Sequence, residues 1–153
     1  MKKLKILLFI LLALPLSVLA QGWPIDYGGV MLQGVYWDSF TLSQWTKLEN
    51  RTNDLKGYFD LVWVPQSGRC LNSMSMGYDP YYFFDQTSSF GSATELKSMI
   101  STFKSNGILT IADVVINHHN NDNTGWWGFP SEQYNGITYQ LLPSDIIRND
   151  DGG

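Results

Sequence analysis

Apolar residues recur along the chain in a pattern that predicts three strands and two helices. Three stretches rich in β-branched and aromatic residues, 30–37, 60–65 and 108–116, have the composition of short strands. The segment 41–56, between the first two, places Leu, Trp and Leu side chains at spacings that can share one helical face. Gly57 follows this segment and is expected to end the helix.

The second helix, between the second and third strands, has the clearest signals. Ser92 and Glu95 fit a capping box, in which the serine hydroxyl and the glutamate carboxylate satisfy amides of the first turn. Gly107 is expected to form the C-cap. An apolar stripe with helical spacing lies between them. It consists of Leu96, Met99, Ile100 and Phe103.

The order strand, helix, strand, helix, strand indicates two βαβ units and a parallel α/β sheet. Two of the strands are almost wholly apolar, so we expect both of their faces to be covered. The aromatic run 81–84, within the long loop 66–90, is interpreted as core. Three strands make an incomplete sheet, and the chain stops in the polar loop 149–153, so we interpret it as part of a longer protein.

The N-terminus has the pattern of a secretory signal peptide, residues 1–20. Three lysines within the first five residues precede an unbroken apolar run from Ile6 to Leu14, and cleavage is expected after Ala20. The alternative is a membrane anchor, but the apolar run is shorter than the roughly 20 residues that cross a bilayer. We therefore expect export, to the periplasm or outside the cell, with no membrane attachment after cleavage.

Removal of that segment makes the chain more acidic. It takes three of the 10 basic residues and leaves seven against 14 acidic ones, a net charge of −7. This charge argues against nucleic acid or an anionic membrane surface as a partner. The abundant Asn, Ser, Gly and aromatic residues suit a neutral, hydroxyl-rich ligand. Cys70 is the only cysteine, so the chain has no internal disulfide, and an inert thiol is expected.

Polar residues that could bind a ligand or take part in catalysis lie at the end of the third predicted strand. Asp113 lies inside the apolar part, and Asn117 and His118 follow it. Sites in parallel α/β folds form at the carboxyl ends of strands. An Asn carbonyl suits Ca²⁺, a His can donate a hydrogen bond to a hydroxyl, and a buried Asp needs a partner. The alternative is that Asn117 caps a turn and both histidines, His118 and His119, are loop residues that face solvent.

Four segments in order resemble the α-amylase family, glycoside hydrolase family 13. "DVVINH" (113–118) resembles the first short signature region of these enzymes, and "GYDPYYFFD" (77–85) resembles the segment after their second barrel strand. "FGSATELKSMISTFKSNGILTIADVVINH" resembles the helix and strand that follow, and "MLQGVYWDSF" resembles their first strand. The resemblance implies a (β/α)₈ TIM barrel, of which residues 21–118 carry the first three β-strands and two helices. Residues 119–153 would begin a B-domain-like insertion.

The resemblance also implies roles for individual residues. Tyr78 would stack on the sugar beside the scissile bond, His118 would hydrogen-bond hydroxyls of the same sugar, and Asp113 would support the site. Asn117 would bind a structural Ca²⁺ between the barrel and the insertion. Further candidates come from the insertion: Asp150 and Asp151 for calcium, and Trp126 and Trp127 for more distant sugars. His119 departs from the family pattern and receives no role.

The segments that resemble the family do not include its catalytic groups. A retaining glycosidase needs a carboxylate nucleophile and a carboxylic acid, and in this family both come from later barrel strands. The expected whole protein is a monomeric, secreted hydrolase of α-1,4 bonds in starch or maltooligosaccharides, and the chain alone is expected to be inactive. The alternatives are a non-catalytic glucan-binding or remnant module, or another family 13 specificity such as a glucosidase or transglycosylase.

Overall fold

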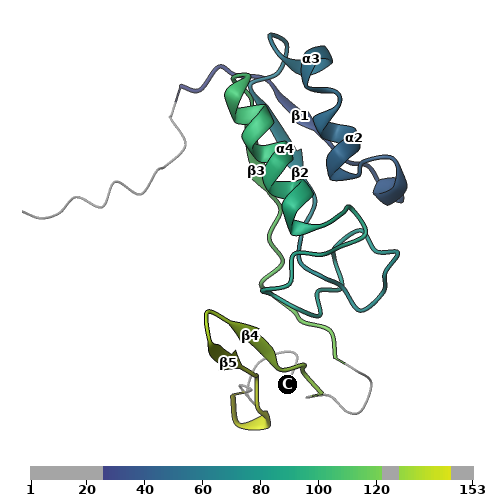
Figure 1. Cartoon of the computed structure of the whole chain (residues 1–153), viewed down its shortest axis with the longest axis vertical. Helices are drawn as coiled ribbons and strands as arrows, with labels where there is room; N and C mark the ends of the chain where they lie inside the picture. The colour runs from purple at the N-terminus through teal and green to yellow at the C-terminus, as the bar shows by residue number, and fades with distance from the viewer. Residues whose placement is uncertain (1–25, 122–127, 146–153) are drawn as a thin grey trace, which may run out of the picture.

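The computed structural model describes residues 26–121 and 128–145, which form one helix-covered parallel sheet and a separate hairpin (Figure 1). The elements in chain order are β1 (Met31–Gln33), η1 (Ser39–Thr41), α2 (Trp45–Glu49), α3 (Thr52–Leu55), β2 (Leu61–Val64), α4 (Ala93–Ser105), β3 (Leu109–Ala112), β4 (Glu132–Tyr134), β5 (Ile137–Tyr139) and η2 (Pro143–Asp145). The predicted signal peptide, residues 1–20, lies outside the described residues.

The three-stranded sheet has the order β1-β2-β3, and both pairings are parallel, as the alternation of strands and helices predicted. The third strand is shorter than predicted and ends at Ala112 instead of Ile116. Pro65, directly after β2, has no amide hydrogen with which to continue the ladder. The last backbone hydrogen bond between the β2 and β3 segments is donated by the Asp113 amide to the Val64 carbonyl, at 3.0 Å.

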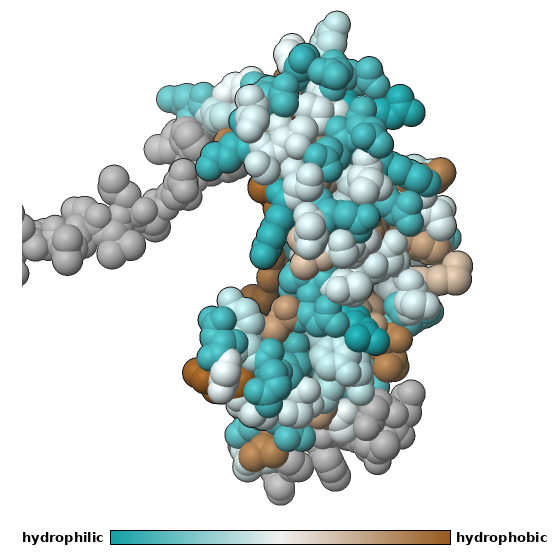
Figure 2. Space-filling view, in the orientation of Figure 1, coloured by the Kyte–Doolittle hydropathy of each residue, from teal (hydrophilic) through white to brown (hydrophobic). Residues whose placement is uncertain are grey.

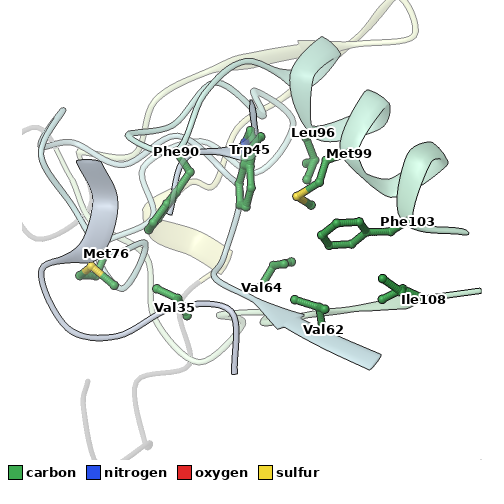
Figure 3. Close-up of a cluster of buried hydrophobic side chains, with 10 residues drawn as sticks. All are labelled: Val35, Trp45, Val62, Val64, Met76, Phe90, Leu96, Met99, Phe103 and Ile108. Carbon is green, nitrogen blue, oxygen red and sulfur yellow. The ribbon is translucent and has the colours of Figure 1, made fainter. Parts of the chain in front are cut away.

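The hydrophobic core lies between the helices and one face of the sheet (Figure 3). Phe103 and Met99 of α4 are fully buried against Val62 of β2, and Trp45 of α2 packs on Phe90 with ring centroids 5.3 Å apart. The predicted capping box is confirmed. The Ser92 amide donates to the Glu95 carboxylate at 2.7 Å, and the Glu95 amide donates to the Ser92 hydroxyl at 3.3 Å.

The prediction of one continuous helix over 41–56 is wrong. The segment contains two short helices, α2 and α3, and Leu42 lies before both and is 61% exposed. The Thr52 hydroxyl donates to the Glu49 carbonyl at 2.5 Å, a side-chain bond that competes with helix continuation. The Glu49 carboxylate instead joins the helices, because it accepts from Ser98 and Thr102 of α4 at 2.8 and 2.6 Å.

The opposite face of the sheet is open along its outer strands, so the prediction that both faces are covered holds for β2 but is wrong for β3. Met31 of β1 and Leu109 of β3 are each 53% exposed, whereas Leu61 of β2, which lies between them in register, is 2% exposed. In a (β/α)₈ barrel this face points toward the barrel interior. On the side seen in Figure 2 the helical part is largely hydrophilic, and hydrophobic residues reach the surface closer to the hairpin.

The predicted core position of the aromatic run 81–84 is also wrong. Phe83 and Phe84 are 42% and 36% exposed, and their amides each donate to the Glu132 carboxylate at 2.8 Å. Phe84 also stacks on Tyr134 of β4, with centroids 4.6 Å apart. The run therefore packs on the β4-β5 hairpin, because the buried Glu132 satisfies its backbone amides there.

Two expectations concern membranes and the thiol. No helix within the described residues is long and apolar enough to cross a membrane. Cys70 is buried, and burial raises the pKa of its thiol, which favours the neutral and less reactive form.

Candidate functional site

The predicted site residues that the structure describes lie beyond the carboxyl ends of β2 and β3. These two ends share one edge because the strands are parallel. Gln66 follows β2 after Pro65, and Asp113 follows β3 directly. The loop 66–90 then returns Tyr78 to this edge, so the fold brings Tyr78 and Asp113 together although they are 35 positions apart in the sequence.

Gly77 fixes the approach of Tyr78 to the sheet. Its φ is +99°, which residues with a side chain rarely adopt. A Cβ at this position would lie 2.8 Å from the Gln66 carbonyl oxygen and 3.0 Å from the Gln66 Cβ. Only glycine lets the loop pass this close to the residue that follows β2, and Tyr78 is placed by that contact.

Tyr78 and Asp113 form the centre of the site. The Tyr78 hydroxyl donates to Asp113 Oδ2 at 2.8 Å. Burial, followed by the hydrogen bond to Asp113 and its charge, raises the pKa of Tyr78 above its usual range, so the hydroxyl remains a donor at neutral pH. The Tyr78 side chain is 40% exposed, which leaves part of its ring available to a ligand.

His118 also reaches Tyr78, but through the backbone. Its Nε2 lies 2.8 Å from the Tyr78 carbonyl oxygen, which can only accept, so Nε2 carries the proton in this arrangement. Both His118 and Asn117 are exposed and lie beyond the end of β3, as predicted, although the strand ends earlier than expected. Tyr78, Asp113 and His118 are therefore one connected group, with Asn117 directly beside it in the chain.

The metal-site residues cannot be assembled from the described part of the chain. Asp150 and Asp151 lie outside it, as do the predicted sugar-stacking residues Trp126 and Trp127. Among residues 26–121 and 128–145 no three His, Cys, Asp or Glu side chains are close enough to hold a metal ion. Asn117 offers one exposed carbonyl oxygen, a donor type that suits Ca²⁺.

His119, which received no role from the sequence, is part of the aromatic contact with the hairpin. Its ring lies 4.5 Å from Phe83 and 5.3 Å from Phe129, measured between centroids. Burial lowers the pKa of His119, which favours its neutral form. His119 thus packs between the loop and the hairpin instead of facing the site.

Trp37 is a site neighbour that sequence reasoning missed. It lies in the turn between β1 and η1, is 70% exposed, and its ring is within 6° of parallel to the Tyr78 ring at a centroid distance of 6.4 Å. The available signal was its position: an aromatic residue in the loop after a parallel strand lies on the edge where sites form.

The arrangement suits binding and orientation of a hydroxyl-rich ligand. It offers exposed aromatic faces on Trp37 and Tyr78, a carboxylate on Asp113 and an exposed imidazole on His118. The Asp113 carboxylate is already bonded to Tyr78 and is therefore better placed to position groups than to attack.

Comparison with curated proteins finds α-amylases. The chain is 32% identical over 117 residues to probable α-amylase 2 of Arabidopsis thaliana, and the match covers 76% of this chain and 27% of that protein. It is 27% identical over 103 residues to chloroplastic α-amylase 3 of the same plant, and this match covers 64% of the chain and 11% of that protein. It is 26% identical over 86 residues to glucan 1,4-α-maltohexaosidase of Bacillus sp. (strain 707), and this match covers 50% of the chain and 17% of that protein.

Solved structures give the same answer for the fold. Two crystal structures of MutB mutants, one soaked with trehalulose and one in complex with the substrate sucrose, match with a TM-score of 0.55 and 26% identity. The match covers 66% of this chain and 19% of each MutB chain, so the parallel sheet and its helices are an incomplete (β/α)₈ barrel. No family model matches the chain. From the α-amylase relatives and the shared barrel, the chain belongs to the α-amylase family, glycoside hydrolase family 13.

Proposed function

We propose that this chain is the N-terminal portion of a secreted α-amylase-like hydrolase that cleaves α-1,4-glucosidic bonds of starch or related glucans. The observation that carries the proposal is the connected group of Tyr78, Asp113 and His118 at the carboxyl edge of the sheet. The α-amylase relatives support the reaction class. The chain spans 27% or less of the length of these curated relatives, so the activity is proposed for the whole protein.

In this proposal the described residues form one wall of the sugar site. The exposed face of Tyr78 stacks on a pyranose ring, and its hydroxyl is held by Asp113 so that the ring keeps its orientation. His118 donates to the Tyr78 carbonyl and, after a small rotation, to a sugar hydroxyl. The nucleophile and the general acid of retaining hydrolysis are assigned to no residue of this chain.

A calcium ion belongs to the proposal as a structural group. Asn117, Asp150 and Asp151 would hold it between the barrel and a B-domain-like insertion that begins at residue 119. Oxygen ligands of this kind match the preference of Ca²⁺. The test is the unfolding temperature of the chain with calcium and with a chelator. A rise with calcium that Asn117→Ala removes supports the site, and identical values overturn it.

Export is the cellular part of the proposal. The cationic start, the apolar run and the small residues before Gln21 support cleavage after Ala20. Sequencing the N-terminus of the protein from the culture medium or periplasm tests it. A mature N-terminus at Gln21 supports export, and an intact Met1 contradicts it.

The function is tested with the purified chain, starch and maltoheptaose. We expect no starch hydrolysis, measurable maltoheptaose binding by calorimetry, and loss of binding in Tyr78→Ala. Tyr58→Ala is the matched control, because Tyr58 is 74% exposed and distant in sequence from the site. Hydrolysis by the chain would contradict the assignment of the catalytic groups elsewhere. Absence of binding, or equal binding by Tyr78→Ala, would contradict the proposed wall.

A further inference from the structure

The β4-β5 hairpin is hydrogen-bonded to the loop that carries Tyr78 through the side chain of Glu132. The hairpin lies on the far side of the loop 66–90 from the helices (Figure 1). Glu132 Oε1 accepts from the Phe83 amide and Oε2 from the Phe84 amide, each at 2.8 Å. One carboxylate thus holds two adjacent backbone amides of a loop 49 and 48 positions earlier in the chain.

These two amides are the partners on which the Glu132 carboxylate depends. Glu132 is 8% exposed, and it takes part in neither of the salt bridges found within residues 26–121 and 128–145. A buried charge is costly unless it is hydrogen-bonded. Movement of the loop away from the hairpin would leave the carboxylate without its donors, so the hairpin resists that movement.

The segment 79–82, which joins Tyr78 to the two amides, is short and has little freedom. The Arg69 carbonyl accepts from the last two amides of the segment at 2.9 and 3.0 Å, and the Asn120 amide donates to the Pro80 carbonyl at 2.7 Å. Pro80 is fully buried, and its ring fixes its φ. A displacement at the end of this segment is therefore passed on to Tyr78, because a tightly held segment moves as a unit.

We propose that Glu132 is a positioning residue of the sugar site, which keeps Tyr78 in its binding position through the loop. This inference rests on the proposed function. Glu132 lines neither the hollow that includes Tyr78 nor the one that includes Asp113, so it acts through the loop and not by contact with the sugar. The coupling is reciprocal: a hairpin docked by Glu132 raises the affinity for the sugar, and a bound sugar strengthens the docking of the hairpin.

The experiment follows the placement of Tyr78 first without sugar and then with it. NMR of the full chain records the Tyr78 ring signals and the hydrogen exchange of the amides of 83–84 in the wild type, Glu132→Ala and Glu132→Gln. Glu132→Gln keeps an acceptor oxygen for one of the two amides, so it covers the case in which Glu132→Ala does not fold. Gln133→Ala is the matched control, because Gln133 is the exposed neighbour in β4 and its side chain bonds Thr138 of β5 instead of the loop.

In the sugar-free protein we expect Glu132→Ala to shift the Tyr78 ring signals and to speed exchange at 83–84 about tenfold. Glu132→Gln should have an intermediate effect and Gln133→Ala no effect on either. Maltoheptaose should bind Glu132→Ala about tenfold more weakly than the wild type, and Gln133→Ala within about twofold of it. Exchange in α4 should stay within about twofold in all variants, which shows that the core remains folded. Saturating maltoheptaose should slow exchange at 83–84 in the wild type.

Unchanged Tyr78 ring signals in sugar-free Glu132→Ala overturn the inference, whatever the chain binds. Faster exchange at 83–84 with an unchanged affinity for maltoheptaose also overturns it, because Glu132 would then stabilise only the hairpin. Equal weakening by Gln133→Ala overturns it too, since any loosening of the hairpin would then suffice. A wild-type chain that binds no maltoheptaose overturns the proposed function, whereas the sugar-free comparison still decides whether Glu132 places Tyr78.

Discussion

Replacement of Gly77 by alanine tests how the sheet edge positions Tyr78. The new Cβ would meet the Gln66 carbonyl oxygen at 2.8 Å, a backbone atom that cannot rotate away. The positive φ of +99° adds a cost of about 1–2 kcal/mol for a residue with a Cβ. Overpacking of this kind costs about 1–3 kcal/mol more. We therefore expect the unfolding free energy to fall by about 2–5 kcal/mol, a large part of the 5–15 kcal/mol typical of a domain.

Gly57→Ala is the matched control for this variant. Gly57 has a similar φ of +83°, and a Cβ there would meet nothing within 4 Å. It should show the conformational cost of about 1–2 kcal/mol without the clash. Urea unfolding followed by tryptophan fluorescence measures both variants, and calorimetry with maltoheptaose measures the site.

Gly77→Ala should also bind maltoheptaose more weakly than Gly57→Ala, because the clash can be relieved only by moving the loop that carries Tyr78. The reasoning is refuted if the two variants have the same unfolding free energy and the same affinity. In that case the close approach of Gly77 to Gln66 would not position the site.

Four further predictions concern the helix cap, the hairpin and the core. Ser92→Ala should lower the unfolding free energy by about 1 kcal/mol through loss of the helix cap, as urea titration would show. Hydrogen bonds from Ser92 lower the pKa of Glu95 in the folded state. The stabilising contribution of the Glu95 carboxylate is therefore present above its unfolded-state pKa and is lost as pH falls through its folded-state pKa. This loss of stability at acid pH, followed by circular dichroism, should be smaller in Ser92→Ala. Glu132→Ala leaves the two amides of 83–84 without their acceptor and should speed proteolysis within the β4-β5 hairpin, whereas an unchanged rate would show that the carboxylate does not hold it. Phe103→Ala, at a fully buried position, should cost about 3–5 kcal/mol, and a loss below 1 kcal/mol by urea titration would contradict the described core.

The sheet and the second helix could be predicted because local pattern and tertiary packing agree there. The capping box at Ser92 forms as predicted, and Met99 and Phe103 of the apolar stripe are buried in the core against the sheet. The prediction that Ile100 joins this buried stripe is wrong, because it is 38% exposed. A stripe read from spacing alone is wider than the face that the neighbouring strands and helix cover.

The hairpin was missed although its strongest signal was present. Asn135 and Gly136 both have positive φ, 51° and 77°, as in the two-residue turns that join antiparallel strands. The short flanking strands, Glu132–Tyr134 and Ile137–Tyr139, gave little alternation of apolar and polar residues. The contact of Glu132 with the loop 48 and 49 positions earlier lies beyond any local pattern.

The site divides in the same way. Tyr78, Asp113 and His118 came from short motifs, and the structure brings them together, but their roles in sugar binding stay predictions. Sequence could not give the parallel placement of Trp37 on Tyr78, which depends on how the first strand lies beside the second. A single aromatic residue after a strand has many uses, and only the spatial neighbour distinguishes them.

The most direct test of the central claim is an NMR titration of the chain with maltoheptaose, with assignments for the site and for a distant reference. We predict saturable shifts at Tyr78, His118 and Trp37, the residues that form or adjoin the proposed wall. The Tyr58 resonances, from an exposed aromatic residue outside the wall, should stay constant. Binding that leaves Tyr78 and His118 unperturbed, or no binding at all, would contradict the account.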